Sequence, residues 1–343
     1  MATILDLPNE IHPLIGMHLR PMALYSCIRV CRYFYSAYSP CLWSNVTVYG
    51  GRNSIEAESL RTNAHHVQVF GIWAAVTEDY YTIVFPRLRT LELRTFFSRY
   101  DDDSSSMPSI SPHLQVQFAR RHPTVRKLIY HNADALPREF WETVETDWKE
   151  LETLEIFDMV EVDKMDAFWK VPYVFVRDIA TAPKPWGCLK LEALTVYIAK
   201  QAGDEARWEA QVFEQISRLR RLLKLDLQRV PQDARIENES RPQEVKDWAT
   251  LDLRLGSRSK DSSNIGVETG GGADIRCWSS LVQMEYFTYG GDRQTLGIDE
   301  LVWMTEHWKN LSFVFGGFKG IVEDEDCAER DRIIKSMGLH LHD

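Results

Sequence analysis

A short hydrophobic phrase that recurs along the chain limits its possible folds more than any other feature of the sequence. The phrase is an aliphatic residue, two others, an aliphatic residue, one other and an aliphatic residue, as in LRTLEL and LEALTV. The fourth residues of its copies, at spacings of 24, 37, 26, 40, 31, 26, 33 and 30, are Val67, Leu91, Leu128, Leu154, Leu194, Leu225, Leu251, Met284 and Val314. Because such alternation is typical of a strand with one buried face, the sequence predicts a series of short strands.

Amphipathic helices are predicted between these strands. Segment 137–149 opens on a proline and repeats apolar residues at helical spacing, while segments 204–219 and 299–309 open on the possible caps Asp204 and Asp299. A unit of strand, turn and helix can bury its apolar face only against the next unit. We therefore expect an α/β solenoid that curves into an arc, with parallel strands on the concave side and helices on the convex side.

The phrase resembles the strand motif of leucine-rich repeats in an irregular form. Regular repeats contain about 20 to 29 residues, so the longer spacings require insertions. Three stretches that are rich in glycine, serine, proline and charge are predicted to be flexible insertions, near residues 98–113, 231–244 and 256–274.

The first 45 residues or so are predicted to form helices with more apolar surface than a unit of about that size can bury. Pro8 is tolerated near a helix start, and Pro21 can open a second helix. Pro13 would lie further inside the first helix, so we expect a kink there or a helix that becomes regular only after it. A third short turn is predicted to end at Trp43, and residues 45–50 alternate like a strand.

This segment resembles an F-box, and the matching positions are Leu7-Pro8, Glu10-Ile11, Ile15, Leu19 with Pro21, Leu24, Val30-Cys31-Arg32, Phe34-Tyr35 and Leu42-Trp43. The resemblance implies an F-box at residues 1–48 and a leucine-rich-repeat-like arc at residues 49–343, a frequent arrangement in fungal proteins. It also implies that three short helices dock on the Skp adaptor of a cullin-based ubiquitin ligase. The chain would then be the substrate-recognition subunit, and an unknown protein would be its target.

Some apolar side chains of the F-box-like segment are expected to contact the adaptor, namely Leu7, Pro8, Ile11, Leu14, Ile15, Leu24, Ile28, Val30 and Trp43. The alternative is that all of them belong to the core and that the helices only cap a repeat scaffold, since a solenoid needs a cap in either case. The two interpretations differ in whether these side chains are exposed in the folded chain.

The target is expected to bind on the concave side of the strands. Neighbouring residues of a strand point to opposite faces of the sheet, and aromatic and charged side chains are common anchors in protein interfaces. The candidate residues are Phe70, Arg94, Phe157, Tyr197, Asp226, Asp252, Arg254, Glu285 and Phe287. Asp226 and Asp252 are expected on adjacent strands near Glu285, which would favour a basic element in the target.

Composition and charge exclude other classes of function. The formal net charge of −10 argues against non-specific nucleic-acid binding. No stretch approaches the about 20 apolar residues of a membrane span, and the first residues show no secretory signal. With only six cysteines in 343 residues, we expect a reducing compartment, in the cytoplasm or the nucleus.

The residue types that carry chemistry are sparse. Cys27 and Cys31 lie one helical turn apart but lack a second pair for zinc, so small buried thiols on an apolar face are the better interpretation. His340 and His342 would be two metal ligands without a third. We find no nucleotide-binding, protease or kinase motif and predict a non-catalytic subunit without metal or cofactor. A catalytic site assembled from dispersed residues remains a further alternative.

Overall fold

The computed structural model describes residues 4–49, 54–73, 76–94, 112–131, 138–156, 174–181, 184–199, 206–228, 253–254, 273–289 and 298–315. They belong to two compact units, Met1–Leu128 and Ile129–Asp343. Most of each predicted insertion lies outside the described residues, as do His340 and His342. Within the described segments, no helix combines the length and the hydropathy that crossing a membrane requires.

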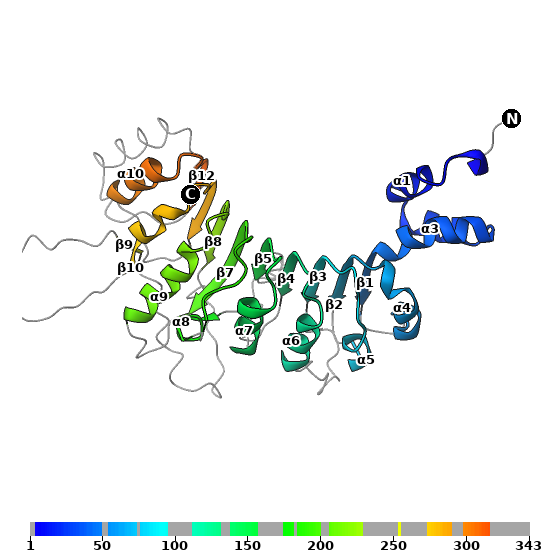
Figure 1. Cartoon of the computed structure of the whole chain (residues 1–343), viewed down its shortest axis with the longest axis horizontal. Helices are drawn as coiled ribbons and strands as arrows, with labels where there is room; N and C mark the ends of the chain where they lie inside the picture. The colour runs from blue at the N-terminus through cyan, green and yellow to red at the C-terminus, as the bar shows by residue number, and fades with distance from the viewer. Residues whose placement is uncertain are drawn as a thin grey trace, which may run out of the picture. The chain divides into compact units, whose positions relative to one another are not determined.

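The first unit opens with helices and continues with strands that alternate with helices (Figure 1). Its elements are η1 (Ile4–Asp6), α1 (Ile11–His18), α2 (Pro21–Ile28), α3 (Arg32–Ser44), β1 (Asn45–Tyr49), α4 (Ala57–Asn63), η2 (Ala64–His66), β2 (Val69–Trp73), α5 (Glu78–Tyr81), β3 (Thr90–Arg94) and α6 (Pro112–Arg120), and β4 (Lys127–His131) begins at its end. In Figure 1, α4, α5 and α6 lie on the same side of β1, β2 and β3.

The second unit repeats the alternation of strand and helix. Its elements are α7 (Arg138–Thr146), β5 (Thr153–Ile156), β6 (Val174–Phe175), α8 (Val176–Ala180), β7 (Ala193–Ala199), α9 (Ala206–Ser217), β8 (Lys224–Gln228), β9 (Leu253–Arg254), β10 (Ala273–Asp274), η4 (Ile275–Ser280), β11 (Tyr286–Tyr289), α10 (Ile298–His307) and β12 (Phe313–Phe315). The predicted helices in segments 137–149, 204–219 and 299–309 are thus present as α7, α9 and α10.

The strands form a parallel sheet whose order follows the chain. The order is β1-β2-β3-β4-β5-β7-β8-β11-β12, while β6 pairs with β7 outside this path and β9 and β10 form a separate two-stranded sheet. The prediction of parallel strands joined by turns and helices is confirmed. Leu251 itself lies outside the described residues; the short strand after it, β9, pairs with β10, and the neighbour of β8 in the main sheet is β11.

Each repeat enters its strand through the same turn. The backbone amide of the residue that opens the phrase donates to the carbonyl of a buried residue three positions earlier, as in Leu88 to Phe85 (3.2 Å) and Leu222 to Leu219 (2.9 Å). The carbonyl of the next residue accepts two amides from the following repeat: that of Gln68 accepts the amides of Arg89 (2.8 Å) and Thr90 (3.0 Å). These bonds stack one turn on another.

Strand register corrects the assignment of inward and outward residues in two repeats. Phe70 is paired with Leu91, and Phe287 is paired with Leu225, and all four side chains are fully buried. The phrase therefore begins at Val67 and at Met284, three residues later than predicted. The error arises because the residue three positions before the true start of the phrase, ahead of the turn, is also apolar. The pattern can therefore be matched three residues too early.

Candidate protein-binding surfaces

The first helix starts later than predicted, and this removes the difficulty of its internal proline. The amide of Ile11 donates to the carbonyl of Pro8 (3.0 Å), and α1 runs from Ile11 to His18 without interruption. Pro13 is thus the third helical residue, where a backbone N–H would have no acceptor within the helix. The expected kink, or delayed start of the regular helix, at Pro13 is wrong for this reason.

A buried histidine and a glycine, rather than aliphatic residues, form the part of α1 that faces the interior of the three-helix segment. His12 is fully buried, and its Nδ1 lies 3.2 Å from the hydroxyl of Tyr38. The His12 ring also contacts Tyr33, with ring centroids 5.1 Å apart. Gly16 faces Cys41 so closely that a Cβ there would lie 2.6 Å from the sulfur. Because these residues occupy the inner face of α1, its aliphatic side chains lie on the outer face.

Exposed apolar side chains are concentrated in this segment. Of the fifteen large hydrophobic side chains that are exposed among the described residues, ten lie between Ile4 and Tyr35. Leu7, Ile11, Leu14 and Val30 were predicted, and Leu14 is 51% and Val30 is 68% exposed. The others, which the sequence reasoning missed, are Ile4, Met17, Met22, Tyr25, Tyr33 and Tyr35. This density of exposed apolar groups is typical of a protein-binding surface, and we call these ten residues the docking surface.

The remaining predicted adaptor contacts are less accessible. Pro8 is exposed, whereas Ile15, Ile28 and Trp43 are half-buried. Leu24 is 4% exposed, so its assignment to the binding surface is wrong. It lies on α2, which packs against α3, and thus contributes to the interior that holds the docking surface in place.

The thiols of the segment show no sign of metal binding. Cys27 and Cys41 are half-buried and Cys31 is exposed, so the interpretation of Cys27 and Cys31 as small buried thiols is wrong for Cys31. The described residues contain no group of three or more possible metal ligands. Burial raises the pKa of the Cys41 thiol, which makes it a poorer nucleophile at neutral pH.

The outward face of the strands in the first unit carries an aromatic and cationic ladder. Register aligns Tyr49 on β1 with Trp73 on β2 and Arg94 on β3. The Tyr49 and Trp73 rings meet edge to face with centroids 5.4 Å apart, and the Arg94 guanidinium lies 4.0 Å from the centre of a Trp73 ring. Arg94 also forms an ion pair with Glu92. Of the predicted target-binding residues, Arg94 is the one that belongs to this ladder.

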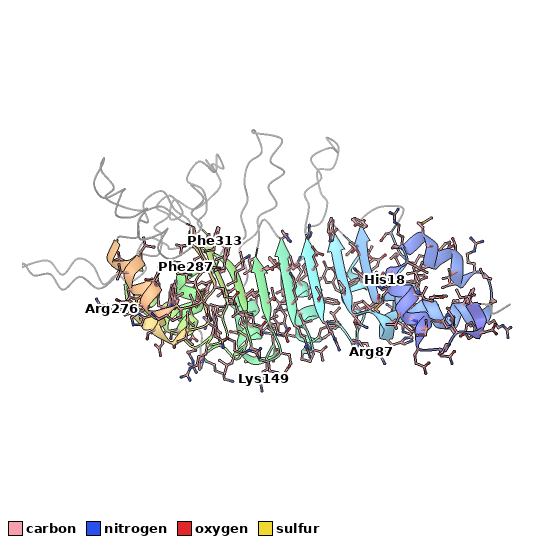
Figure 2. All side chains as sticks on the ribbon, turned by 90° about the horizontal axis from the view of Figure 1, so that it is seen from above. His18, Arg87, Lys149, Arg276, Phe287 and Phe313 are labelled. Carbon is pink, nitrogen blue, oxygen red and sulfur yellow. The ribbon has the colours of Figure 1, made fainter. Side chains whose placement is uncertain are left out.

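A second ladder lies on the outward face of the strands in the second unit. Lys224 on β8, Tyr286 on β11 and Phe313 on β12 share one level of the sheet. The Tyr286 and Phe313 rings stack with centroids 4.3 Å apart, and the Lys224 ammonium lies 5.2 Å from the centre of the Tyr286 ring. Phe313 and Phe287 are both labelled in Figure 2. Phe287, which was predicted for this face, instead belongs to the core, and so does Phe70 of the first unit.

The predicted acidic cluster is not formed as expected. Asp226 is 5% exposed and pairs in register with Thr195 and Thr288, which are buried too. Glu285 is exposed but precedes β11, in the turn that enters the strand. Because β9 pairs with β10, β8 and β9 are not adjacent. The positions of these acidic residues therefore no longer support the expectation of a basic element in the target.

Of the remaining candidate residues for target binding, the structure describes two and leaves two outside its described residues. Arg254 belongs to β9, and Tyr197 belongs to β7 at the level of Gln228. Phe157 and Asp252 lie outside the described residues.

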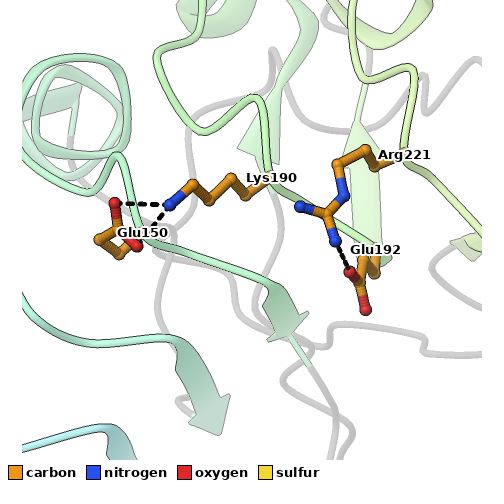
Figure 3. A network of polar contacts seen from close by, with 4 residues as sticks. All are labelled: Glu150, Lys190, Glu192 and Arg221. Carbon is orange, nitrogen blue, oxygen red and sulfur yellow. Dashed lines mark hydrogen bonds and ion pairs between the residues drawn. The ribbon is translucent and has the colours of Figure 1, made fainter.

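Charges at the turns that enter the strands differ between the units. In the second unit they are paired across neighbouring repeats (Figure 3): Lys190 Nζ lies 2.7 and 2.6 Å from the two carboxylate oxygens of Glu150, and Arg221 pairs with Glu192. In the first unit the corresponding turns carry His66, Arg87 and Arg89. Neither Arg87 nor Arg89 forms an ion pair with any residue that the structure describes.

Comparison with known proteins agrees with the position of the docking surface. No curated protein matches the chain. Among solved structures, one chain from the complex of Rad7 and Elc1 of yeast is similar, with 12% sequence identity and a TM-score of 0.32, over 97% of this chain and 92% of that one. Residues 4–49, which contain the docking surface, match the family model of F-box-like domains.

Proposed function

We propose that the chain is the substrate-recognition subunit of a Skp–cullin–F-box ubiquitin ligase. Its docking surface binds the Skp adaptor, and the strand faces bind a target protein. The observation that supports this most directly is the concentration of exposed apolar side chains between Ile4 and Tyr35, within the F-box-like match. Covering one aliphatic side chain of this size is worth about 1.5–3 kcal/mol, so a partner that covers several of them gains substantial affinity.

The proposed role requires proximity rather than chemistry in this chain. Ubiquitin transfer belongs to other subunits, and holding the target beside them raises its effective concentration. The subunit needs neither metal nor cofactor for this, and it acts in the cytoplasm or the nucleus. The ladders Tyr49–Trp73–Arg94 and Lys224–Tyr286–Phe313 supply the aromatic and cationic anchors that protein interfaces use.

The alternative is a repeat scaffold in which the first helices serve only as a cap. One pair of variants separates the two. The double variant Ile11→Asp and Leu14→Asp places charges on exposed positions of α1, and the matched control Leu189→Asp and Val282→Asp does the same in the second unit, where Leu189 is as exposed as Leu14, at 51%. Binding to purified Skp adaptor is measured by calorimetry, and folding is measured by circular dichroism.

We expect the first variant to remain folded and to bind the adaptor at least about tenfold more weakly, because charge is then buried without a partner in the interface. The control should bind like the unmodified chain. A first variant that unfolds would support the cap alternative. A folded, unmodified chain that forms no adaptor complex at micromolar concentration would overturn the proposal.

A further inference from the structure

The part of the chain that carries most of the docking surface contains no acidic side chain. Residues 11–55 include neither Asp nor Glu, although the whole chain has 50 of them and a formal net charge of −10. Both α2 and α3 lie in this range, and neither has an acidic residue in its first turn. By contrast, α4, α5 and α7 each carry at least one there. A helix N-terminus bears a partial positive charge that acids stabilise, so α2 and α3 lack the usual compensation.

Three arginines add full positive charges to the same two helices. Arg20 is the N-cap of α2, Arg29 is its C-cap, and Arg32 is the first residue of α3. All three side chains are exposed, and none of them forms an ion pair with a residue that the structure describes. Because residues 11–55 contain no carboxylate side chain, neither helix can neutralise these charges from its own sequence. The positive charge of the arginines is therefore accessible to a partner.

The arginines lie among the exposed apolar side chains of the docking surface. The outer face of α2 consists of exposed residues at helical spacing, namely Met22, Tyr25, Ser26 and Arg29. Leu24, on the other side of the helix, is buried. The guanidinium of Arg29 lies 5.5 Å from the centre of the Tyr25 ring, and Met22 is 77% exposed. Tyr and Arg are the residue types that most often dominate binding in protein interfaces, and here they share one contact area with an aliphatic side chain.

We infer that the partner of the docking surface is acidic where it binds, with carboxylates that face Arg20, Arg29 and Arg32 around an apolar contact. The partner is the adaptor of the proposed function, on which this inference rests. A guanidinium group holds a carboxylate with two parallel hydrogen bonds, and opposite charges around an interface mainly raise the rate of association. The local positive charge would also offset the repulsion between an acidic partner and a chain with a net charge of −10.

An anionic membrane surface would attract the same combination of arginines and apolar groups. A membrane-surface helix lies in the plane of the bilayer and buries one continuous apolar face. The exposed apolar side chains of the docking surface instead come from all three helices, of which α1 and α2 both pack against α3. A protein surface can follow such a folded shape, and we therefore assign the acidic groups to a protein.

The test follows the association of the full chain with purified Skp adaptor by stopped-flow fluorescence at several salt concentrations. The variant Arg29→Glu with Arg32→Glu reverses two exposed charges beside the apolar contact. The matched control, Arg218→Glu with Arg220→Glu, makes the same change in net charge at exposed positions of the second unit. Circular dichroism measures whether each variant is folded, and the salt series on the unmodified chain needs no variant at all. The same chains are also mixed with vesicles that contain phosphatidylserine.

We expect the association rate of the unmodified chain to fall as salt screens the charges. At low salt the arginine variant should associate about tenfold or more slowly, because two attractive contacts become repulsive, while the control should change less than about twofold. An association rate that does not respond to salt, equal losses in variant and control, or tighter binding to the vesicles than to the adaptor would overturn the inference. The first two results leave adaptor binding in place, whereas the absence of any adaptor complex would overturn the proposed function as well.

Discussion

At the scale of single residues, His122 joins two repeats of the first unit through both ring nitrogens. Its Nε2 accepts a hydrogen bond from the amide of Phe85 (3.0 Å), and its Nδ1 donates to the carbonyl of Phe118 (2.7 Å). Burial is the main cause that lowers the pKa of His122 to about 4. The unfolded chain, where the pKa is about 6.5, therefore binds more protons between these values. Stability should be complete above about pH 6.5 and should fall by up to about 3 kcal/mol as the pH drops to about 4.

Urea unfolding at several pH values checks this, with His122→Asn as the variant and His113→Asn, at an exposed position of the preceding helix α6, as the control. The control should keep the pH dependence, and the His122 variant should lose this part of it. Equal pH dependence in both variants would contradict the role of His122. A buried histidine was not predictable here, because other repeats have Ala64, Phe85 or Trp148 at the equivalent place before the turn.

At the scale of elements, the fit of α1 against α3 depends on Gly16. A Cβ at this position would lie 2.6 Å from the sulfur and 3.1 Å from the Cβ of Cys41. Gly16→Ala gains about 0.5–1 kcal/mol in helix propensity but forces the two helices apart, which costs about 1–3 kcal/mol. We expect a net loss of stability in thermal unfolding. In a chain that also carries Cys41→Ala, the Gly16→Ala substitution should lower the stability less, because the sulfur that the new Cβ would meet is absent. A Gly16→Ala chain that is more stable than the unmodified chain would contradict the close fit of the two helices.

Elements were predictable where one periodicity dominates, as in α7, α9 and α10. Prediction from the sequence failed where a helix-breaking residue competes with the packing of buried side chains. The third helix was expected as a short turn that ends at Trp43, yet α3 runs from Arg32 to Ser44 with Pro40 inside it. An internal proline costs about 3 kcal/mol, and packing of the buried Tyr38 and Ser39 outweighs that cost. Four of the ten residues of the docking surface were predicted, since the family pattern marks aliphatic positions but not Met17, Met22 or Tyr25.

At the scale of the whole molecule, the repeat phrase predicted the order of strands because each repeat needs only its neighbours to bury its core. The second unit illustrates this dependence. Trp278 stacks on Phe213 with ring centroids 4.6 Å apart, its Nε1 donates to the carbonyl of Phe213 (3.0 Å), and its own carbonyl accepts Nε1 of Trp308 (3.3 Å). Trp278 thus links three successive layers through its side chain and its backbone carbonyl, a role that spacing in the sequence cannot reveal.

Trp278→Ala should therefore destabilise the second unit by about 3–5 kcal/mol, seen as faster amide hydrogen exchange in β8, β11 and β12. The docking surface lies wholly within residues 4–35, so we expect the adaptor affinity of this variant to stay within about twofold of that of the unmodified chain. Trp278→Phe, which keeps the stacking and loses the hydrogen bond, should show a smaller effect on exchange. If adaptor affinity fell in step with the stability of the second unit, binding would require the intact repeats, and the assignment of adaptor binding to the first helices alone would be wrong.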